Sequence, residues 1–341
     1  MASQQTPTER ERRMHIVYGA MFSVIALAAL VAVVKTYLDA NNTVSQTASV
    51  TNATPSITVN LSDNAASTTS NYSDASTTVT LTENSGKSVY VHGTATDTNG
   101  CDDITKANAT WDLVVYRTNL AATSTCSADN ANCYKDASES TLTTSGCTAG
   151  GSDTGLNYEF GPISLQFYAD ATDASTYSGT NWTAYVTVDD ANSSGSVASS
   201  TDTFEVASTN ALDASGQTLA YGSVALGALS SEQSITVSNT GNRQIDATVS
   251  STDFSCANDT SIDLATVDAL GATTTSRAAS TTLTDYGKVR NSGSEITLDT
   301  SLAQQSSNTS STDTLYFRFE APSSGAGGAC TATVTLTSSA E

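Results

Sequence analysis

The chain has 341 residues and carries 34 acidic but only 13 basic side chains, which gives a net charge of −21. Nucleic-acid binding depends on Lys and Arg side chains that neutralise phosphates, so this charge balance excludes nucleic acid as a partner. Two histidines leave little material for a His-based metal site or a catalytic triad. We therefore expect no enzyme of those classes.

An uncharged apolar segment occupies residues 16–34 (IVYGAMFSVIALAALVAVV). A helix over it is about 28 Å long at ~1.5 Å per residue, close to the roughly 30 Å hydrocarbon core of a bilayer. Residues 15–38 are therefore predicted to form a transmembrane helix that contacts the lipid bilayer through residues 16–34.

The charges on either side of this segment predict its orientation. Arg10, Arg12 and Arg13 precede the segment, whereas Lys35 is the one basic residue that follows it closely. Because cytoplasmic flanks carry the excess of Lys and Arg, residues 1–14 are predicted to be a cytoplasmic tail. The C-terminal domains of this single-pass cell-membrane protein are then extracellular.

Two other interpretations of the segment stay open. A cleaved signal peptide has a shorter apolar region, usually about 7–15 residues. A pilin-type leader also joins a short charged stretch to an apolar helix that packs in a filament core, but it keeps Lys or Arg directly before the Gly at the cut. Here Tyr18 precedes Gly19, which argues against that processing but not against filament membership.

The rest of the chain predicts an all-β ectodomain of two immunoglobulin-like antiparallel β-sandwiches. Residues 39–55 are polar without periodicity and indicate a stalk linker. Period-two alternation of apolar residues with Thr and Ser indicates strands with one wet face. We place the sandwiches at residues 56–208 and 209–341. Expected strands lie at 57–61, 79–81, 89–92, 113–116, 163–167, 182–188, 204–206, 219–221, 235–237, 245–249, 296–298, 315–319 and 333–336.

All six cysteines follow the apolar segment, four in the first predicted domain and two in the second. An even number in each domain outside the membrane indicates disulfides. Cys256 and Cys330 are the one pair possible in the second domain. The first four allow three connectivities, of which we favour Cys101–Cys147 with Cys126–Cys133, because these bonds would staple the polar insert at residues 119–155.

Two stretches resemble known surface domains. Residues 218–252 include YGSVALG and SITVSNTGN and resemble the opening of hydin-like (ASPM–SPD-2–hydin) immunoglobulin-like domains. VHGTATDTNG at residues 91–100 and VDDAN at residues 188–192 are similar to bacterial and archaeal surface immunoglobulin-like domains. The resemblance implies a prokaryotic surface protein. The turn at Asn239-Thr240-Gly241-Asn242 predicts a positive φ at Gly241.

Carboxylates are the plentiful reactive groups. Oxygen ligands suit Ca²⁺, and acidic residues crowd the turns near residues 97–103 and 189–190. Asp and Asn are also ordinary turn formers, and no run has the spacing of a twelve-residue calcium loop, so both interpretations stay open. The candidate calcium ligands are Asp97, Asn99, Asp102, Asp103, Asp189 and Asp190.

Other residues have a structural and a functional interpretation. His92 is expected to be a strand histidine rather than a catalytic base, and Trp111 and Trp182 to fill a core rather than form a carbohydrate platform. Glycosylation sequons, whose number is near that expected by chance in a chain rich in Ser and Thr, occur at Asn41, Asn52, Asn60, Asn71, Asn108, Asn181, Asn192, Asn258 and Asn308.

The sequence thus predicts a non-enzymatic, membrane-anchored surface protein of a prokaryote with a structural or adhesive role. Its expected partners are the bilayer and other surface proteins or glycans, with Ca²⁺ as the candidate cofactor. One alternative is a subunit of a pilus-like filament whose apolar helix forms the core and whose segment 43–61 adds a strand to a neighbour. A second alternative is a stalked polysaccharide-binding module.

Overall fold

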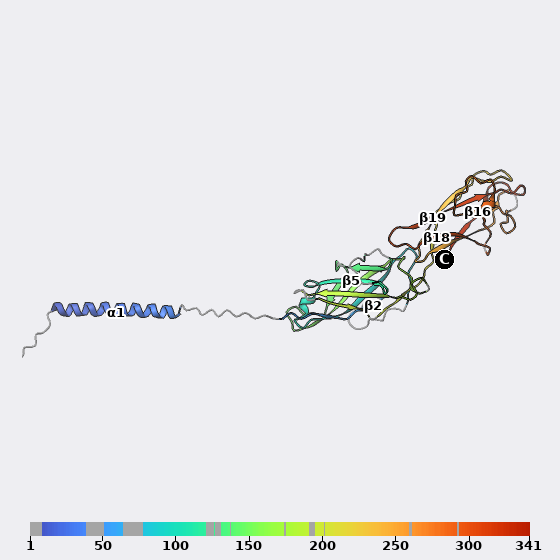
Figure 1. Ribbon diagram of the computed structural model, residues 1–341. Coiled ribbons are helices and arrows are strands. Elements are labelled where there is room, and N and C mark those ends of the chain that lie inside the picture. Colours follow the sequence, from blue (N-terminus) through green and yellow to red (C-terminus); the bar gives the residue numbers. More distant parts are fainter. Residues whose placement is uncertain are drawn as a thin grey trace, which may run out of the picture. The chain divides into compact units, whose positions relative to one another are not determined.

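The computed structural model gives two compact units, residues 1–51 and 52–341. The first contains one helix and the second contains the β-strands (Figure 1). The residues that the structure describes are 9–38, 51–63, 78–120, 126, 131–136, 138–173, 175–190, 195–200, 202–258, 261–291 and 293–341.

Helix α1 (Glu9–Leu38) begins earlier than the predicted start at residue 15. Arg12–Ala32 is long and apolar enough to cross a membrane, and none of it is buried within the protein. A helix of this length and composition can serve as a membrane anchor or as a signal segment. Most of the predicted stalk lies outside the described residues, but Asn52 already belongs to the β-rich unit.

The first β-region, residues 52–207, has two antiparallel sheets. One has the order β1-β4-β8-β7 with β2 also paired to β4, the other the order β10-β9-β5-β6, and β3 pairs with β11 in parallel. The strands are β1 (Ser56–Ile57), β2 (Asn60–Ser62), β3 (Thr78–Val79), β4 (Lys87–Thr96), β5 (Thr110–Arg117), β6 (Cys133–Asp136), β7 (Leu142–Ser145), β8 (Gly155–Leu165), β9 (Trp182–Asp189), β10 (Gly195–Ser199) and β11 (Glu205–Val206), with a 3₁₀ turn η1 at Cys101–Ile104.

Alternate residues of both sheets form the core of this region. Val89 and Val91 come from β4, and Leu113 and Val186 come from β5 and β9; all four are 0% exposed. The alternation of apolar and polar residues along β4, β5 and β9 therefore turns one face of each sheet inward, as the sequence predicts.

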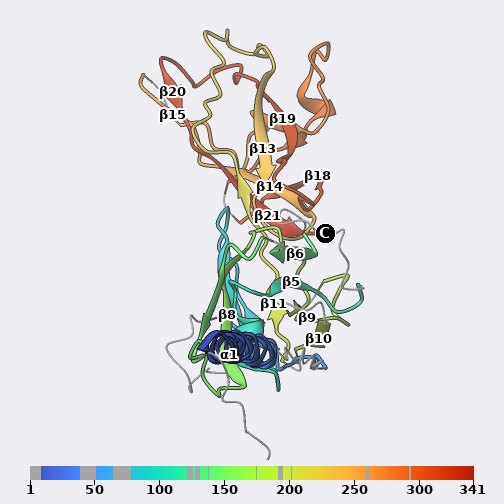
Figure 2. The same cartoon turned by 90° about the vertical axis from the view of Figure 1, so that its left-hand side faces the viewer.

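The second β-region, residues 208–341, also has two antiparallel sheets, β12-β13-β19-β16-β17 and β18-β14-β21, and a separate β15–β20 pair. In Figure 2 the β15–β20 pair lies at the end of the region farther from β6, whereas β14 and β21 lie nearer to β6. The elements are β12 (Leu212–Asp213), β13 (Gln233–Asn239), β14 (Ile245–Ser251), β15 (Ser255–Cys256), β16 (Leu270–Thr273), the 3₁₀ turn η2 (Leu283–Asp285), β17 (Gly287–Lys288), β18 (Ile296–Leu302), β19 (Ser311–Phe319), β20 (Cys330–Thr331) and β21 (Val334–Ala340).

The all-β prediction is confirmed, but several elements differ. The strand predicted at residues 219–221 does not form. The Gln217 side chain instead hydrogen-bonds the backbone of Thr236 in β13, accepting from its N–H at 2.6 Å and donating to its carbonyl. These bonds occupy the edge of β13 where a neighbouring strand would pair. Conversely, β6 and β7 form inside the polar insert at residues 119–155, where no strand was predicted.

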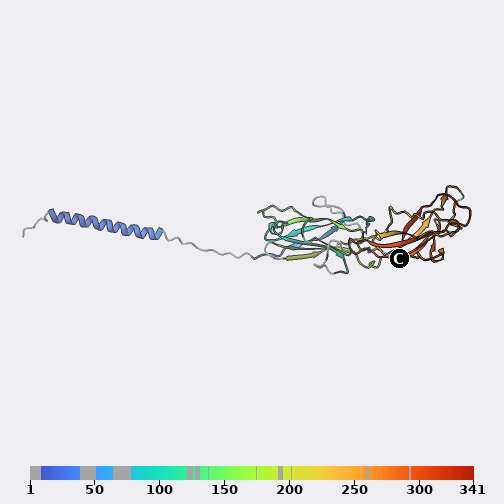
Figure 3. The same ribbon diagram turned by 90° about the horizontal axis from the view of Figure 1, so that it is seen from above.

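The two β-regions meet in a buried polar junction within the same compact unit. The side chain of Asn242, 1% exposed, donates to the carbonyls of Ala169 and Ala207 at 3.0 Å each. Its Oδ1 accepts from the N–H of Thr209 at 2.7 Å. The predicted domain boundary at residues 208/209 therefore lies inside this network, and each β-region keeps its own sheets on either side of it (Figure 3).

A second set of bonds crosses the junction. Gln304 donates to the carbonyl of Tyr168 at 2.8 Å and to Asp170 at 2.9 Å, while Asp170 also accepts from Arg117 at 2.8 Å. Arg117 and Asp170 both have side chains 5% exposed. Buried charged and amide groups are costly unless all are hydrogen-bonded, so this network fixes one relative placement of the parts it joins.

The prediction of a positive φ at Gly241 is wrong, because Gly241 is not among the glycines with that conformation. Position 241 requires glycine for a different reason. A Cβ at this position would lie 2.1 Å from the carbonyl oxygen of Thr209. The backbone of the turn approaches the backbone of the junction too closely for any side chain.

We expect Gly241→Ala to lower the free energy of unfolding by about 1–3 kcal/mol, because the backbone must shift to admit the methyl group. Gly179→Ala is the matched control, since a Cβ there meets nothing within 4 Å. Thermal unfolding of both variants measures the difference. Equal midpoints for the two variants would contradict the close approach.

Candidate functional site

Four of the six candidate calcium ligands gather at one place. Asp97 directly follows β4 in one sheet and Asp190 directly follows β9 in the other. The two carboxylates are 1% and 5% exposed, respectively. Burial raises the pKa of Asp97, a hydrogen bond from the N–H of Asn99 opposes this, and the charges of Asp190 and Asp103 raise it further.

The start of the β-rich unit closes over these residues. Asn52 donates through Nδ2 to Asp190 at 2.8 Å, and the N–H of Ala53 donates to the side-chain oxygen of Asn99 at 2.5 Å. Sequence reasoning placed Asn52 in the stalk. No spacing signal connects it to the acidic turns, because it reaches them only through the fold.

The other two candidates lie elsewhere. Asp189 is exposed at the end of β9 and is paired in register with Gly195. Asp102 accepts from the N–H of Gly150 at 2.5 Å and lies beside the Cys101–Cys147 disulfide. Among the described residues, the one group of three His, Cys, Asp or Glu side chains at metal-binding distances contains these two bonded sulfurs and Asp102, so it offers one carboxylate only.

The six cysteines are joined as Cys101–Cys147, Cys126–Cys133 and Cys256–Cys330. These are the pairs favoured from the sequence. The last bond connects β15 to β20, which are separated by 74 positions. A loop of that length gives a stabilisation of about 4 kcal/mol in the chain-entropy treatment. Three such bonds indicate an oxidising compartment.

The aromatic and histidine candidates are buried. Trp111 and Trp182 are both 0% exposed and belong to the core cluster of the first β-region, so they form no carbohydrate platform. His92 lies in β4 and is 1% exposed. Burial lowers the pKa of His92 to about 4, and its imidazole is therefore neutral at pH 7.

The burial of His92 predicts that the stability of the folded protein depends on pH. An unfolded histidine titrates near 6.5, so the unfolded chain binds more protons between pH 6.5 and about 4. The stability that depends on this group is thus fully present above pH 6.5 and is lost as the pH falls toward 4. We expect His92→Gln to reduce the fall of the melting temperature over this range. Parallel curves for wild type and variant would refute the assignment.

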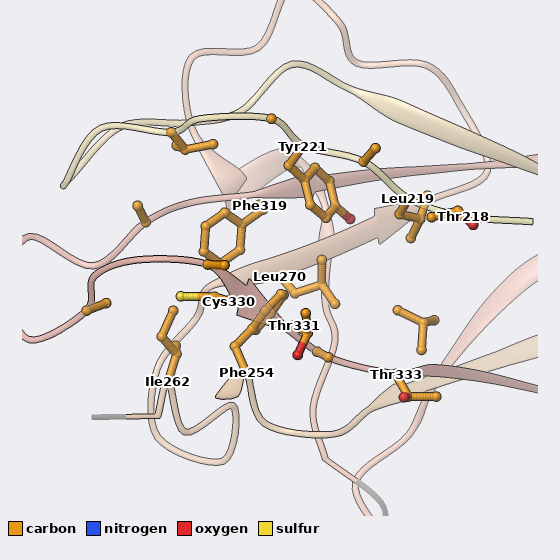
Figure 4. Close-up of a pocket in the computed structure, with 18 of the residues that line it drawn as sticks. Thr218, Leu219, Tyr221, Phe254, Ile262, Leu270, Phe319, Cys330, Thr331 and Thr333 are labelled. Carbon is orange, nitrogen blue, oxygen red and sulfur yellow. The ribbon is translucent and has the colours of Figure 1, made fainter. Parts of the chain in front are cut away.

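A groove of about 1230 Å³ opens in the second β-region. Polar and apolar atoms contribute almost equally to its walls. The Tyr221 and Phe319 rings lie side by side with centroids 5.8 Å apart (Figure 4). Phe254 packs against Phe319 at 4.8 Å. Residues 219–221, which form no strand, are among those that line the groove.

Tyr221 brings a buried polar group to this groove. Its buried hydroxyl has no hydrogen-bond partner among the described residues, and burial raises its pKa well above the usual range. The arrangement can accept an apolar group and offer it a hydrogen bond from this hydroxyl. No sequence pattern predicts the groove, because Leu219 and Tyr221 fit the alternation of an ordinary strand.

The sequons differ in exposure. Asn108, Asn258 and Asn308 are exposed, whereas Asn52, Asn60 and Asn181 are half-buried. Asn41, Asn71 and Asn192 lie outside the described residues. A glycan needs its asparagine side chain in solvent, so the exposed group is the better placed for modification.

No protein-family model matches the chain, and no curated protein matches it. Among solved structures, the chain is similar to the secreted serine protease VesC from Vibrio cholerae, at 8% identity over 77% of this chain and 49% of that chain, with a TM-score of 0.18. It is also similar to a structure named BspA_C_WT, at 11% identity over 78% of this chain and 95% of that chain, with a TM-score of 0.16. The chain thus spans about half of the protease, and neither likeness carries an argument about function.

Proposed function

We propose that the protein is a non-enzymatic, membrane-anchored surface protein of a prokaryote with a structural or adhesive role. The observation that carries this proposal is the pairing of two features in one chain. Arg12–Ala32 is apolar and entirely uncovered by protein. The unit that follows contains three disulfides. The first feature favours a bilayer as its solvent and the second favours an oxidising exterior.

The β-regions are interpreted as two immunoglobulin-like sandwiches. In each region two antiparallel sheets contribute to a single core cluster, and no α-helix connects their strands within the described residues. Such sandwiches serve many functions, and so the fold supports a surface role without naming a ligand. The buried positions of His92, Trp111 and Trp182 favour a scaffold over a catalytic or carbohydrate-binding surface.

The alternative is a filament subunit whose helix α1 packs in a polymer core. The observation that favours it is the exposure of apolar residues all along α1, including Ile16, Phe22 and Leu30, at 70%, 74% and 60%. Gly19 and Ala20 would allow close helix packing. A lone anchor would present the same features to lipid, so the two functions differ in assembly rather than in the single chain.

Topology is tested by placing one cysteine at each end of the chain, because the described residues contain no free cysteine. Ser306→Cys lies at an exposed position and Ser3→Cys lies in the predicted cytoplasmic tail. We expect a membrane-impermeant maleimide to label Ser306→Cys on intact cells and to label Ser3→Cys only after permeabilisation.

Each other outcome has a definite meaning. Labelling of Ser3→Cys alone on intact cells would reverse the orientation, and labelling of neither would place the protein inside the cell. Mature protein that begins after the apolar segment at residues 16–34 would show a cleaved signal peptide and remove the anchor. Ordered fibres in electron micrographs of material sheared from the same cells would replace the anchored monomer with the filament.

A further inference from the structure

The groove of the second β-region lies beside an edge strand whose backbone is open on one side. β21 is the last strand of the sheet β18-β14-β21, and within the described residues no strand pairs with its other side. The N–H of Thr252 donates to the carbonyl of Thr333 at 2.9 Å, just before β21 begins. Because hydrogen-bonding directions alternate along an antiparallel strand, the N–H and C=O groups of Val334 and Leu336 point away from β14. Both residues also line the groove.

The edge of β21 lacks the features that usually prevent pairing with another chain. Edge strands are commonly protected by Lys, by Pro or by a β-bulge. β21 (VTLTSSA) contains no charged residue and no Pro, and it pairs with β14 in continuous register. Leu226, which also lines the groove, is 57% exposed. An unprotected edge beside an exposed apolar side chain is typical of a surface that another strand covers.

The walls of the groove suit an extended polypeptide. In a chain with a net charge of −21, no Asp, Glu, Lys, Arg or His is among the described residues that line it. An extended strand matches walls that are half polar and half apolar, since it offers backbone groups at its edge and alternate side chains on its face. The buried hydroxyl of Tyr221, without a partner among the described residues, offers a further hydrogen bond. In Figure 4, Leu219 and Tyr221 lie on one side of the groove and Thr331 and Thr333 on the other.

The chain itself contains a segment that is free to supply such a strand. Of the predicted donor segment 43–61, residues 56–57 and 60–62 already pair with β4 in the same chain. Residues 44–50 (VSQTASV) precede them and lie outside the described residues. No charged residue occurs between Asp39 and Asp63, so this segment can enter an uncharged groove without burying a charge.

The pattern of residues 44–50 also fits the groove. The linker has no periodicity over its whole length, but these seven residues equal β21 in number. In an extended chain Val44, Ala48 and Val50 lie on one face, and Ser and Thr residues lie on the other. One face is therefore suited to an apolar wall and the other to solvent.

We propose that residues 44–50 of a second copy of this chain add a strand to β21 and fill the groove. The backbone of the added strand pairs with Val334 and Leu336, and its apolar face covers Phe254 and Tyr221, which line the groove. The donor segment follows α1 in the chain, so each pairing connects one copy to the segment after the helix of its neighbour. The inference rests on the structural role proposed above, to which it adds the partner.

The first test measures binding of a fluorescent peptide of residues 42–52 to the full chain in detergent. The recipient chain carries Ala48→Asp, so that its own segment does not compete. We expect one saturable site per chain. A peptide with Ala48→Asp is expected to bind about tenfold more weakly or worse, because its charge enters an uncharged groove. A peptide with Ser49→Asp is the matched control, since it places the same charge on the opposite face and should bind as the unchanged peptide does.

A variant of the recipient tests the edge of β21. Val334→Pro removes an N–H that points away from β14 and leaves the pairing with β14 intact. We expect it to weaken binding of the peptide about tenfold, because a carbonyl of the added strand loses its donor. The melting temperature of the variant shows whether it folds.

The second test identifies which chain supplies the strand. Full chains with a photoreactive side chain at position 48 are mixed in detergent with ¹⁵N-labelled full chains and irradiated. We expect cross-links between heavy and light chains that end in residues 218–224 or 330–336. If Val334→Pro fails to fold, the positions of these cross-links decide the matter.

Three results would overturn the proposal. They are the absence of saturable peptide binding, equal weakening by Ala48→Asp and Ser49→Asp, and cross-links confined to single chains, which would show that the segment binds within its own chain. A failure of the inference is separate from a failure of the proposed function. Neither assay in detergent depends on topology, and the maleimide labelling does not depend on the groove.

Discussion

The structure of the β-rich unit depends on the hydrogen bonds that Asn242 makes across the junction. Its side chain binds the carbonyls of Ala169 and Ala207 and the N–H of Thr209, all of which belong to the first β-region or to the link between the regions. Asn239, in the same turn as Asn242, donates through its side chain to the carbonyls of Leu302 and Ala303 at 3.0 and 3.1 Å. Because these groups are buried, each bond lost would leave a polar atom unsatisfied, at a cost of about 1–3 kcal/mol. These bonds therefore couple the two cores, and we expect them to unfold together rather than independently.

The interactions that stabilise the rest of the β-rich unit are mostly uncharged. Charged side chains are only 14% of the residues, so the unit relies mainly on apolar cores, disulfides and polar networks, one of which includes the buried Arg117–Asp170 ion pair. The Cys101–Cys147 and Cys256–Cys330 bonds hold loops and short strands in separate regions. The acidic cluster at Asp97 and Asp190 is the exception, because it concentrates like charges in a buried place.

The sequence correctly predicts those elements of the fold that depend on local residue patterns. Alternation along β4, β5, β9 and β19 identified buried strands, and an uninterrupted apolar run identified α1. Prediction from the sequence failed where the conformation of a residue depends on a contact with a residue distant in the chain. Leu219 and Tyr221 have the pattern of a strand, but the Gln217 side chain occupies the edge of β13. Gly241 has the sequence of a turn glycine, yet the carbonyl of Thr209 is what excludes a side chain there. Of the candidate ligands, Asp97 and Asp190 met as parts of two sheets, whereas Asn52 joined them without any sequence signal.

The central claim is that residues 52–341 unfold as one unit because the polar junction couples the two cores. Scanning calorimetry of the full chain measures this most directly, through the number of transitions and the ratio of the calorimetric to the van't Hoff enthalpy. The account predicts a single transition with a ratio near one for the wild type, and two separated transitions for Asn242→Ala. Two independent transitions in the wild type would contradict it, and so would an Asn242→Ala variant that retains a single transition at the wild-type temperature.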